Sequence, residues 1–257
     1  MTTTASQRNL TPNRSVKPMV SERFLMGRGR EALCFGEQSA LEDGIATITE
    51  FASRKILVRR EEPVDSSMLL LEGIACRYKD DREGRRQLVA THVPGDFIDL
   101  HGFVLGHLDH DVATIGSVKV AVFRHQALKS MTERLPYLTQ FLWFSTMLDA
   151  AIHREWIFRL SRLGADRRIA HFLCELYVRL DMVGLVEDGT FALPMTQPDL
   201  AEATGLTGVH VNRVLRTLRE RDLAIVDKRK VRVLDWNGLA SLGEFVSTYL
   251  YGSTPIR

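Results

Sequence analysis

The stretch MTQPDLAEATGLTGVHVNRVLRTLRERDL, residues 195–223, carries the strongest structural signal in the chain. Thr196 and Asp199 stand three residues apart just before an apolar period, a pattern typical of a helix N-terminus. Gly205 ends this short helix, and Thr207 can cap a second one whose apolar residues recur at i, i+3, i+4 and i+7. Two helices joined by a short turn that contains Gly predict a helix-turn-helix.

The charge of the chain changes sharply across this unit. Residues 181–202 contain five acidic residues and no Lys or Arg, whereas residues 211–232 contain eight basic and three acidic residues. Residues 224–226 and 231–234 predict a two-strand wing on either side of a basic tip. The alternative interpretation is a solvated basic surface without a partner, which is what a run of charged residues usually forms. Because the caps, the turn and the wing agree in register, we interpret this face as a surface for double-stranded DNA.

The second helix would present its N-terminal side chains to base edges in the major groove. We expect base readout by Val209, His210, Asn212 and Arg213, with Arg213 as a bidentate guanine contact. Other groups would hold phosphates, which position the protein without specifying sequence. These phosphate candidates are Thr196, Thr207, Arg216, Arg219, Lys228, Arg229 and Lys230.

Residues 136–163 predict one helix of about seven turns, because apolar residues recur at helical spacing and no Gly or Pro follows Pro136 before Gly164. A small β-domain cannot cover an apolar stripe of that length. The stripe therefore favours a homodimer seam of the coiled-coil type, with a core helix inside one chain as the alternative. The seam is expected at Phe141, Phe144, Leu148 and Ile152.

Residues 54–124 consist of short β-type runs separated by turn residues, which favours an antiparallel barrel or sandwich. A short helix is expected before them, over residues 38–51, because Leu41, Ile45 and Ile48 share one helical face. Another helix is expected over residues 166–180. The expected strands are 55–58, 68–71, 74–78, 87–93, 112–115 and 118–123.

The composition suits one large or two ordinary globular domains: 257 residues, 45% of them hydrophobic, with 34 Lys plus Arg against 32 Asp plus Glu. No apolar run reaches about 18 residues and the start lacks a secretory signal, so neither a membrane span nor secretion is expected. Three isolated cysteines fit a reducing cytoplasm. The predicted α+β chain has a flexible tail (1–20), a sensor domain (21–135), a dimerisation helix (136–163), a winged helix-turn-helix domain (164–245) and a C-terminal tail (246–257).

This order of elements resembles the Crp/Fnr superfamily of bacterial transcription regulators over residues 45–242. The resemblance implies an antiparallel β-roll of the cyclic-nucleotide-binding type, homodimers on palindromic operators, and RNA polymerase as a partner. It also implies that an effector shifts the two DNA-binding domains relative to each other. The segments that carry it are Leu70-Leu71-Glu72-Gly73, Gly84-Arg85-Arg86-Gln87, Pro94-Gly95-Asp96-Phe97-Ile98 and residues 200–223.

The chain departs from this family where its cofactors bind. Cyclic-AMP-binding members hold the ribose with Gly-Glu-Leu and the phosphate with Arg-Ser/Thr-Ala. This chain has Asp99-Leu100-His101 and Asp111-Val112-Ala113 there, and an aspartate repels a phosphate at close range. Cyclic AMP bound in the usual way is therefore not expected, and the effector stays unknown. The pocket candidates are Asp99, Leu100, His101 and Asp111.

Two further departures concern the metal and the operator. An iron–sulfur cluster held by four thiolates is excluded, because the chain has only Cys34, Cys76 and Cys174. At the second helix of the helix-turn-helix, Val209 stands where many members place the glutamate that reads cytosine. The operator sequence of the best-known members is therefore not carried over.

The remaining chemistry-bearing residues give weaker signals. His92, His101, His107 and His110 match no tight metal signature, so a polar loop is preferred over a metal or haem sensor. The cysteines are expected to pack as small apolar groups rather than act as redox switches. The chain contains no nucleotide-binding glycine loop, nucleophile elbow or zinc-protease motif, so we expect no enzyme. The alternative function is a ligand-, metal- or redox-sensing module whose helix-turn-helix mainly contacts protein.

Overall fold

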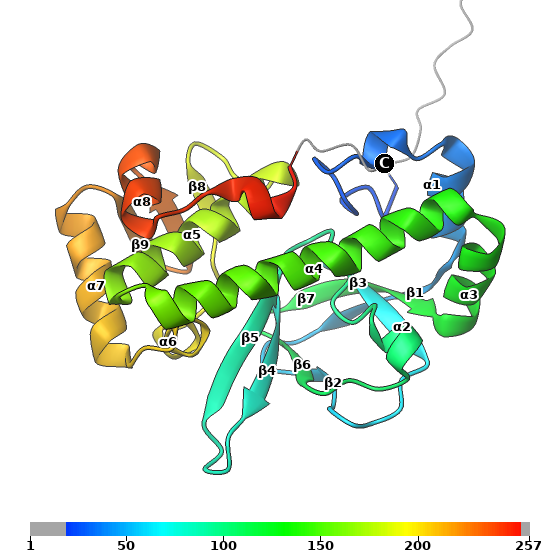
Figure 1. Cartoon of the computed structure of the whole chain (residues 1–257), viewed down its shortest axis with the longest axis horizontal. Helices are drawn as coiled ribbons and strands as arrows, with labels where there is room; N and C mark the ends of the chain where they lie inside the picture. The colour runs from blue at the N-terminus through cyan, green and yellow to red at the C-terminus, as the bar shows by residue number, and fades with distance from the viewer. Residues whose placement is uncertain (1–18, 253–257) are drawn as a thin grey trace, which may run out of the picture.

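The computed structural model describes residues 19–252 and shows a β-roll, a long helix and a C-terminal winged unit (Figure 1). Most of the predicted tail 1–20 lies outside the described residues. The α-helices are α1 (Phe35–Asp43), α2 (Gly102–Leu105), α3 (His125–Arg134), α4 (Pro136–Arg162), α5 (Ala165–Met182), α6 (Gln197–Thr204), α7 (Gly208–Glu220) and α8 (Trp236–Gly243). The 3-10 helices are η1 (Arg30–Ala32) and η2 (Ser247–Leu250).

Ten strands form three antiparallel sheets among the described residues, so the α+β prediction is confirmed. The roll contains the sheets β1-β7-β3 and β2-β6-β4-β5, and the winged unit contains β8-β10-β9. The strands are β1 (Ile45–Phe51), β2 (Ile56–Val58), β3 (Ser66–Glu72), β4 (Ala75–Asp80), β5 (Arg86–His92), β6 (Asp111–Thr114), β7 (Val118–Arg124), β8 (Thr190–Ala192), β9 (Ala224–Asp227) and β10 (Lys230–Val233).

The helix expected over residues 38–51 is wrong in its second half. Helix α1 ends at Asp43, Gly44 follows it, and residues 45–51 form strand β1, which pairs with β7. The apolar spacing that suggested a helix coincides with a strand whose Ile48 is exposed. Three or four apolar residues do not distinguish the period of a helix from that of a strand when the strand follows the helix directly.

The long helix is confirmed almost to the residue, but the four residues predicted for a dimer seam pack against other parts of the same chain. Phe141 is fully buried with Leu128 and Met131 of α3, and Leu148 and Ile152 are buried in the core that the roll shares with the winged unit. Phe144 is half-buried and its ring meets that of Tyr251. Phe141, Leu148 and Ile152 are covered by their own chain and are not free to face a second copy, and Phe144 is partly covered.

Three of the exposed apolar residues of α4 lie in one row on another face. Trp143 is 66% exposed and Ile157 is 69% exposed, and Met147 lies between them in the same row. Residues 143, 147, 150, 154 and 157 follow the alternating spacing of four and three that marks a coiled-coil face. We call Trp143, Met147, Ala150, Arg154 and Ile157 the α4 stripe.

The two ends of the described chain pack against each other beside α4. Arg28 Nε donates to the carbonyl of Leu250 at 2.9 Å, and Arg23 Nε donates to the carbonyl of Val183 at 3.2 Å. Leu250 is fully buried within the 3-10 helix η2, and Tyr249 reaches the core. The segment predicted as a C-terminal tail, 246–257, is thus ordered over much of its described part.

A buried group of charges joins the roll, α4 and α5. Arg179 of α5 donates to Glu175 Oε1 at 3.0 Å, to Asp96 Oδ2 at 2.6 Å and to the carbonyl of Thr91 at 2.9 Å. Glu175 also accepts from the indole of Trp156 at 3.1–3.2 Å. Arg179 and Glu175 are almost completely buried, so each charge depends on its partners for stabilisation.

Arg179→Leu should lower the free energy of unfolding by about 3–5 kcal/mol, because it removes the cation of Asp96 and leaves the buried Glu175 with only the more distant Arg159, at 3.9 Å. Urea unfolding monitored by circular dichroism measures the loss. Arg162→Leu, at the exposed end of α4, is the control and should cost less than about 1 kcal/mol. Equal losses in the two variants would contradict this account.

Candidate nucleic-acid interface

Helix α6 begins with the capping box that the sequence predicts. Asp199 Oδ2 accepts from the backbone N–H of Thr196 at 2.8 Å, and the Asp199 N–H donates to Thr196 Oγ1 at 3.3 Å. Gly205 ends the helix in the left-handed conformation, with φ 62°. A Cβ added there would come within 3.4 Å of Arg168 Nη1, so glycine suits both the backbone angle and the close approach.

Helix α7 follows after a short turn and is capped by Thr207, whose Oγ1 accepts from the His210 N–H at 3.4 Å. Val211, Val214 and Leu218 are buried against the other helices of the winged unit. This burial fixes which side of α7 faces outward. The helix-turn-helix predicted from residues 195–223 is therefore present.

The four residues predicted to read bases are all exposed on one side of α7 near its N-terminus. Val209 is 79% exposed, and His210, Asn212 and Arg213 are exposed beside it. His210 Nδ1 lies 3.2 Å from Thr207 Oγ1, so the cap orients this ring. The arrangement presents a cation, an amide and an apolar side chain together, which is the chemistry that distinguishes base edges.

The predicted phosphate contacts come from three places around α7. Thr196 and Thr207 cap the two helices, and Arg216 and Arg219 are exposed further along α7. Arg216 Nε donates to Glu220 Oε1 at 2.7 Å. At the wing tip, Lys228, Arg229 and Lys230 are exposed. Arg229 also lines a cleft of about 680 Å³ that faces the roll, so its side chain lies on the roll side of the wing.

The structure adds three polar residues of the roll to this neighbourhood. Arg86 of β5 donates from Nε to Glu202 Oε2 at 2.7 Å and from Nη2 to Asp199 Oδ1 at 2.9 Å. Gln87 donates to the backbone carbonyl of Glu202, and Arg54 Nη2 lies 4.0 Å from Asp199 Oδ2. More than 100 residues separate these partners in sequence, so local patterns carry no signal for them.

The predicted effector residues are bonded within the roll. Asp99 Oδ1 accepts from the Met68 N–H at 2.6 Å, and Asp111 Oδ1 accepts from the Arg60 N–H at 3.1 Å. Asp99, Leu100 and Asp111 are buried, and the rings of His101 and His110 lie 5.2 Å apart. Burial lowers the pKa of His101 to about 3. These side chains hold loops of the roll together.

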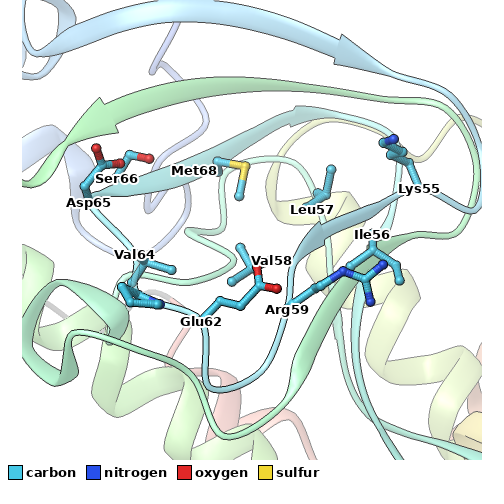
Figure 2. Close-up of a pocket in the computed structure, with 11 residues that line it drawn as sticks. Lys55, Ile56, Leu57, Val58, Arg59, Glu62, Val64, Asp65, Ser66 and Met68 are labelled. Carbon is cyan, nitrogen blue, oxygen red and sulfur yellow. The ribbon is translucent and has the colours of Figure 1, made fainter.

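A groove of about 580 Å³ opens elsewhere on the roll, between β2 and the start of β3 (Figure 2). Its ends differ in charge: Lys55 and Arg59 lie toward one end and Asp65 toward the other. Val58 and Met68 line it between them. Asp99, Leu100, His101 and Asp111 do not line this groove.

The described residues contain no group of three or more His, Cys, Asp or Glu side chains placed to hold a metal ion. Cys34 is exposed, whereas Cys76 and Cys174 are buried, and burial raises the pKa of both buried thiols to about 12. None of the helices within residues 19–252 has both the length and the apolar content that a membrane span requires.

Comparison with known families agrees with this architecture. A model of the Crp-like helix-turn-helix domain matches residues 167–242, and a model of the cyclic nucleotide-binding domain matches residues 48–134. The FixK2 structure from Bradyrhizobium japonicum superimposes with a TM-score of 0.71 at 24% identity, covering 78% of this chain and 98% of that one. The match to FixK2 supports the fold.

Sequence relatives extend the match to function. The transcriptional activatory protein AadR of Rhodopseudomonas palustris is 31% identical over 193 residues, which cover 74% of this chain and 79% of AadR. The transcriptional activator protein FnrL of Cereibacter sphaeroides is 29% identical over 211 residues, covering 80% and 84%. These relatives are transcription regulators and not enzymes. The chain therefore belongs to the Crp/Fnr family of DNA-binding transcription regulators.

Proposed function

We propose that the protein binds palindromic operators as a homodimer, in the cytoplasm, and that the roll modulates its affinity for DNA. The exposed side chains at the start of α7 carry this proposal: Arg213 with Asn212 and His210 on a helix whose opposite side is buried. Such a helix fits the major groove, and two copies related by a two-fold axis read two half-sites. RNA polymerase is a partner by family resemblance.

The α4 stripe supports the homodimer. An exposed row that holds a tryptophan, a methionine and an isoleucine is costly in water, and a second copy of the same helix would cover it. Arg154 interrupts the row with a charge. A single polar residue at a seam position lowers stability but fixes the register of the pair.

Two features of the roll support regulation without a cyclic nucleotide. The carboxylate of Asp111 stands where the resemblance requires an arginine for the phosphate, and its Oδ1 already accepts a backbone hydrogen bond. Arg77 of β4 forms an ion pair with Asp149 of α4 and donates from Nε to the carbonyl of Ile98 at 2.9 Å. The protein's own side chains thus connect the roll to α4, and an effector of another chemistry would have to act on those contacts.

Arg213→Ala should remove the preference for one base pair in each half-site, because a bidentate arginine–guanine contact contributes about 1–3 kcal/mol of discrimination. Selection from a random duplex pool, followed by mobility shifts, measures the preference. Arg216→Ala on the same helix is the control and should weaken binding to all sequences alike. Unchanged specificity in Arg213→Ala would remove this contact from the proposal.

The wild-type protein should bind its selected duplex at least about 10³-fold more tightly than random duplexes, and both affinities should fall steeply with salt. Mobility shifts across a salt series give both affinities. Equal and weak binding to every duplex would instead favour a sensing module whose helix-turn-helix contacts protein.

Trp143→Glu combined with Ile157→Glu should convert the dimer to monomer and weaken operator binding at least about 100-fold, because two buried charges would face each other across the seam. Analytical ultracentrifugation measures the assembly. Val104→Glu, at an exposed apolar residue of α2, is the matched control and should stay dimeric. A wild-type monomer at micromolar concentration would refute the seam.

The buried Asp99 predicts a specific pH dependence. Burial raises its pKa from 3.8 to about 7, and Oδ2 has no hydrogen-bond partner among the described residues. Between these two values the folded state binds more protons than the unfolded state, so the contribution of Asp99 to stability falls as pH rises through this window. Burial lowers the pKa values of His92 and His101, so their contribution to stability rises with pH and opposes that of Asp99. The variant must therefore be compared with wild type at each pH.

Asp99→Asn keeps the acceptor for Met68 and removes the titration. Relative to wild type, its free energy of unfolding should rise progressively between about pH 4 and pH 7. Urea unfolding at several pH values measures the difference. Asp80→Asn, at the exposed end of β4, is the control. Parallel pH curves for Asp99→Asn and wild type would show that Asp99 ionises normally in the fold.

A further inference from the structure

The hairpin β4–β5 of the roll contacts the first helix of the helix-turn-helix through Arg86 and, at a backbone carbonyl, through Gln87. Arg86 contacts two carboxylates at once, Asp199 at 2.9 Å and Glu202 at 2.7 Å, and its guanidinium lies 5.3 Å from the centre of the Tyr78 ring. Its side chain is 24% exposed, while that of Asp199 is 6% exposed. The ring of Tyr78 on one side and the two acids on the other fix the position of Arg86.

The carboxylate that Arg86 holds also caps α6. Asp199 Oδ2 accepts from the Thr196 N–H, and its other oxygen, Oδ1, accepts from Arg86. Thr196 is a predicted phosphate contact, and the first helix of a helix-turn-helix crosses the DNA backbone. Asp199 therefore links Arg86 to Thr196, the predicted phosphate contact.

The charges around α6 show what the contact does. Asp199 and Glu202 are two negative charges on the helix that would approach the phosphates, and alone they would repel DNA within a Debye length of about 10 Å. Arg86 neutralises part of this charge, and Arg54, 4.0 Å from Asp199 and 62% exposed, adds a second cation from the roll. The winged unit carries no Lys or Arg between residues 181 and 202 that could do the same.

We propose that Arg86 is a positioning residue for DNA binding: it carries the state of the roll to α6 by neutralising Asp199 and Glu202 and holding the helix at its N-terminus. The proposal rests on the proposed function and names the contact through which the roll changes DNA affinity. When the hairpin is docked on α6, Arg86 offsets one of the two negative charges and Arg54 the other, so phosphates meet a nearly neutral surface. When it is displaced, they meet two carboxylates.

The neighbouring Arg85 provides a matched control. Its side chain is 76% exposed and pairs only with Asp81 and Glu83 of the same hairpin turn. Arg85→Gln and Arg86→Gln remove the same charge from adjacent positions. Only the second leaves Asp199 and Glu202 without their arginine.

Fluorescence anisotropy of the full-length protein tests this on two duplexes of about 30 base pairs, the selected operator and a random sequence. Arg86→Gln should weaken both about tenfold at low salt, with a smaller difference at high salt because the repulsion is screened. Arg85→Gln should bind like wild type. Glu202→Gln added to Arg86→Gln should restore most of the affinity, and Arg86→Lys should retain part of it. A purely structural defect would not be rescued by removing Glu202.

The outcomes separate this proposal from the proposed function. Wild-type affinity in Arg86→Gln overturns the role of Arg86 while DNA binding stands. Tighter binding in Arg86→Gln also overturns it, because the hairpin would then restrain the winged unit rather than support it. A wild-type protein that binds neither duplex overturns the proposed function, and this proposal with it.

Discussion

The buried carboxylate of Glu175 connects α4, α5 and the last described residues of the chain. It accepts hydrogen bonds from Trp156 of α4, from Arg179 of α5 and from Tyr249 near the C-terminus, and Arg179 continues to Asp96 in the roll. Because Glu175 and Arg179 are almost completely buried, removing one partner of their ion pair costs several kcal/mol. The relation between the roll and the winged unit is therefore set by these discrete contacts together with the apolar core that the two share. An arrangement of that kind favours two distinct states over a continuum.

Helix α4 shows how one element serves two surfaces. Its ends were predictable, because Pro136 starts it and no Gly or Pro interrupts it. Its faces were not, because large apolar residues occur on more than one side and periodicity does not say which side the same chain covers. Phe141 and Leu148 turned out to pack inside the chain, while Trp143 and Ile157 stay exposed. Only the position of the roll and of α5 against the helix separates the core face from the exposed face.

The winged unit was the most predictable part for a physical reason: its signals are local. The cap at Thr196, the left-handed Gly205 and the period of α7 each concern residues within a few positions, so one sequence suffices to find them. Strand β8 was missed because three residues show no period, and it is held by β10 about 40 residues later. Strand β1 was misread because it follows α1 almost without a break. The predicted effector residues lie in the roll, but their bonding to backbone groups depends on loops distant in sequence.

The charge of the DNA-facing surface likewise could not be predicted from local sequence. Counted along the chain, residues 181–202 are purely acidic and should repel phosphate throughout. In the fold, the five acids divide into two groups. Asp181 at the end of α5 and Glu187 and Asp188 before β8 are exposed, whereas Asp199 and Glu202 on α6 are paired with arginines of the roll. The charge that a phosphate would meet at α6 is thus a property of two domains in contact. Since the roll supplies half of that balance, the proposed role of Arg86 would couple the roll to the electrostatics of DNA binding without a change in α7.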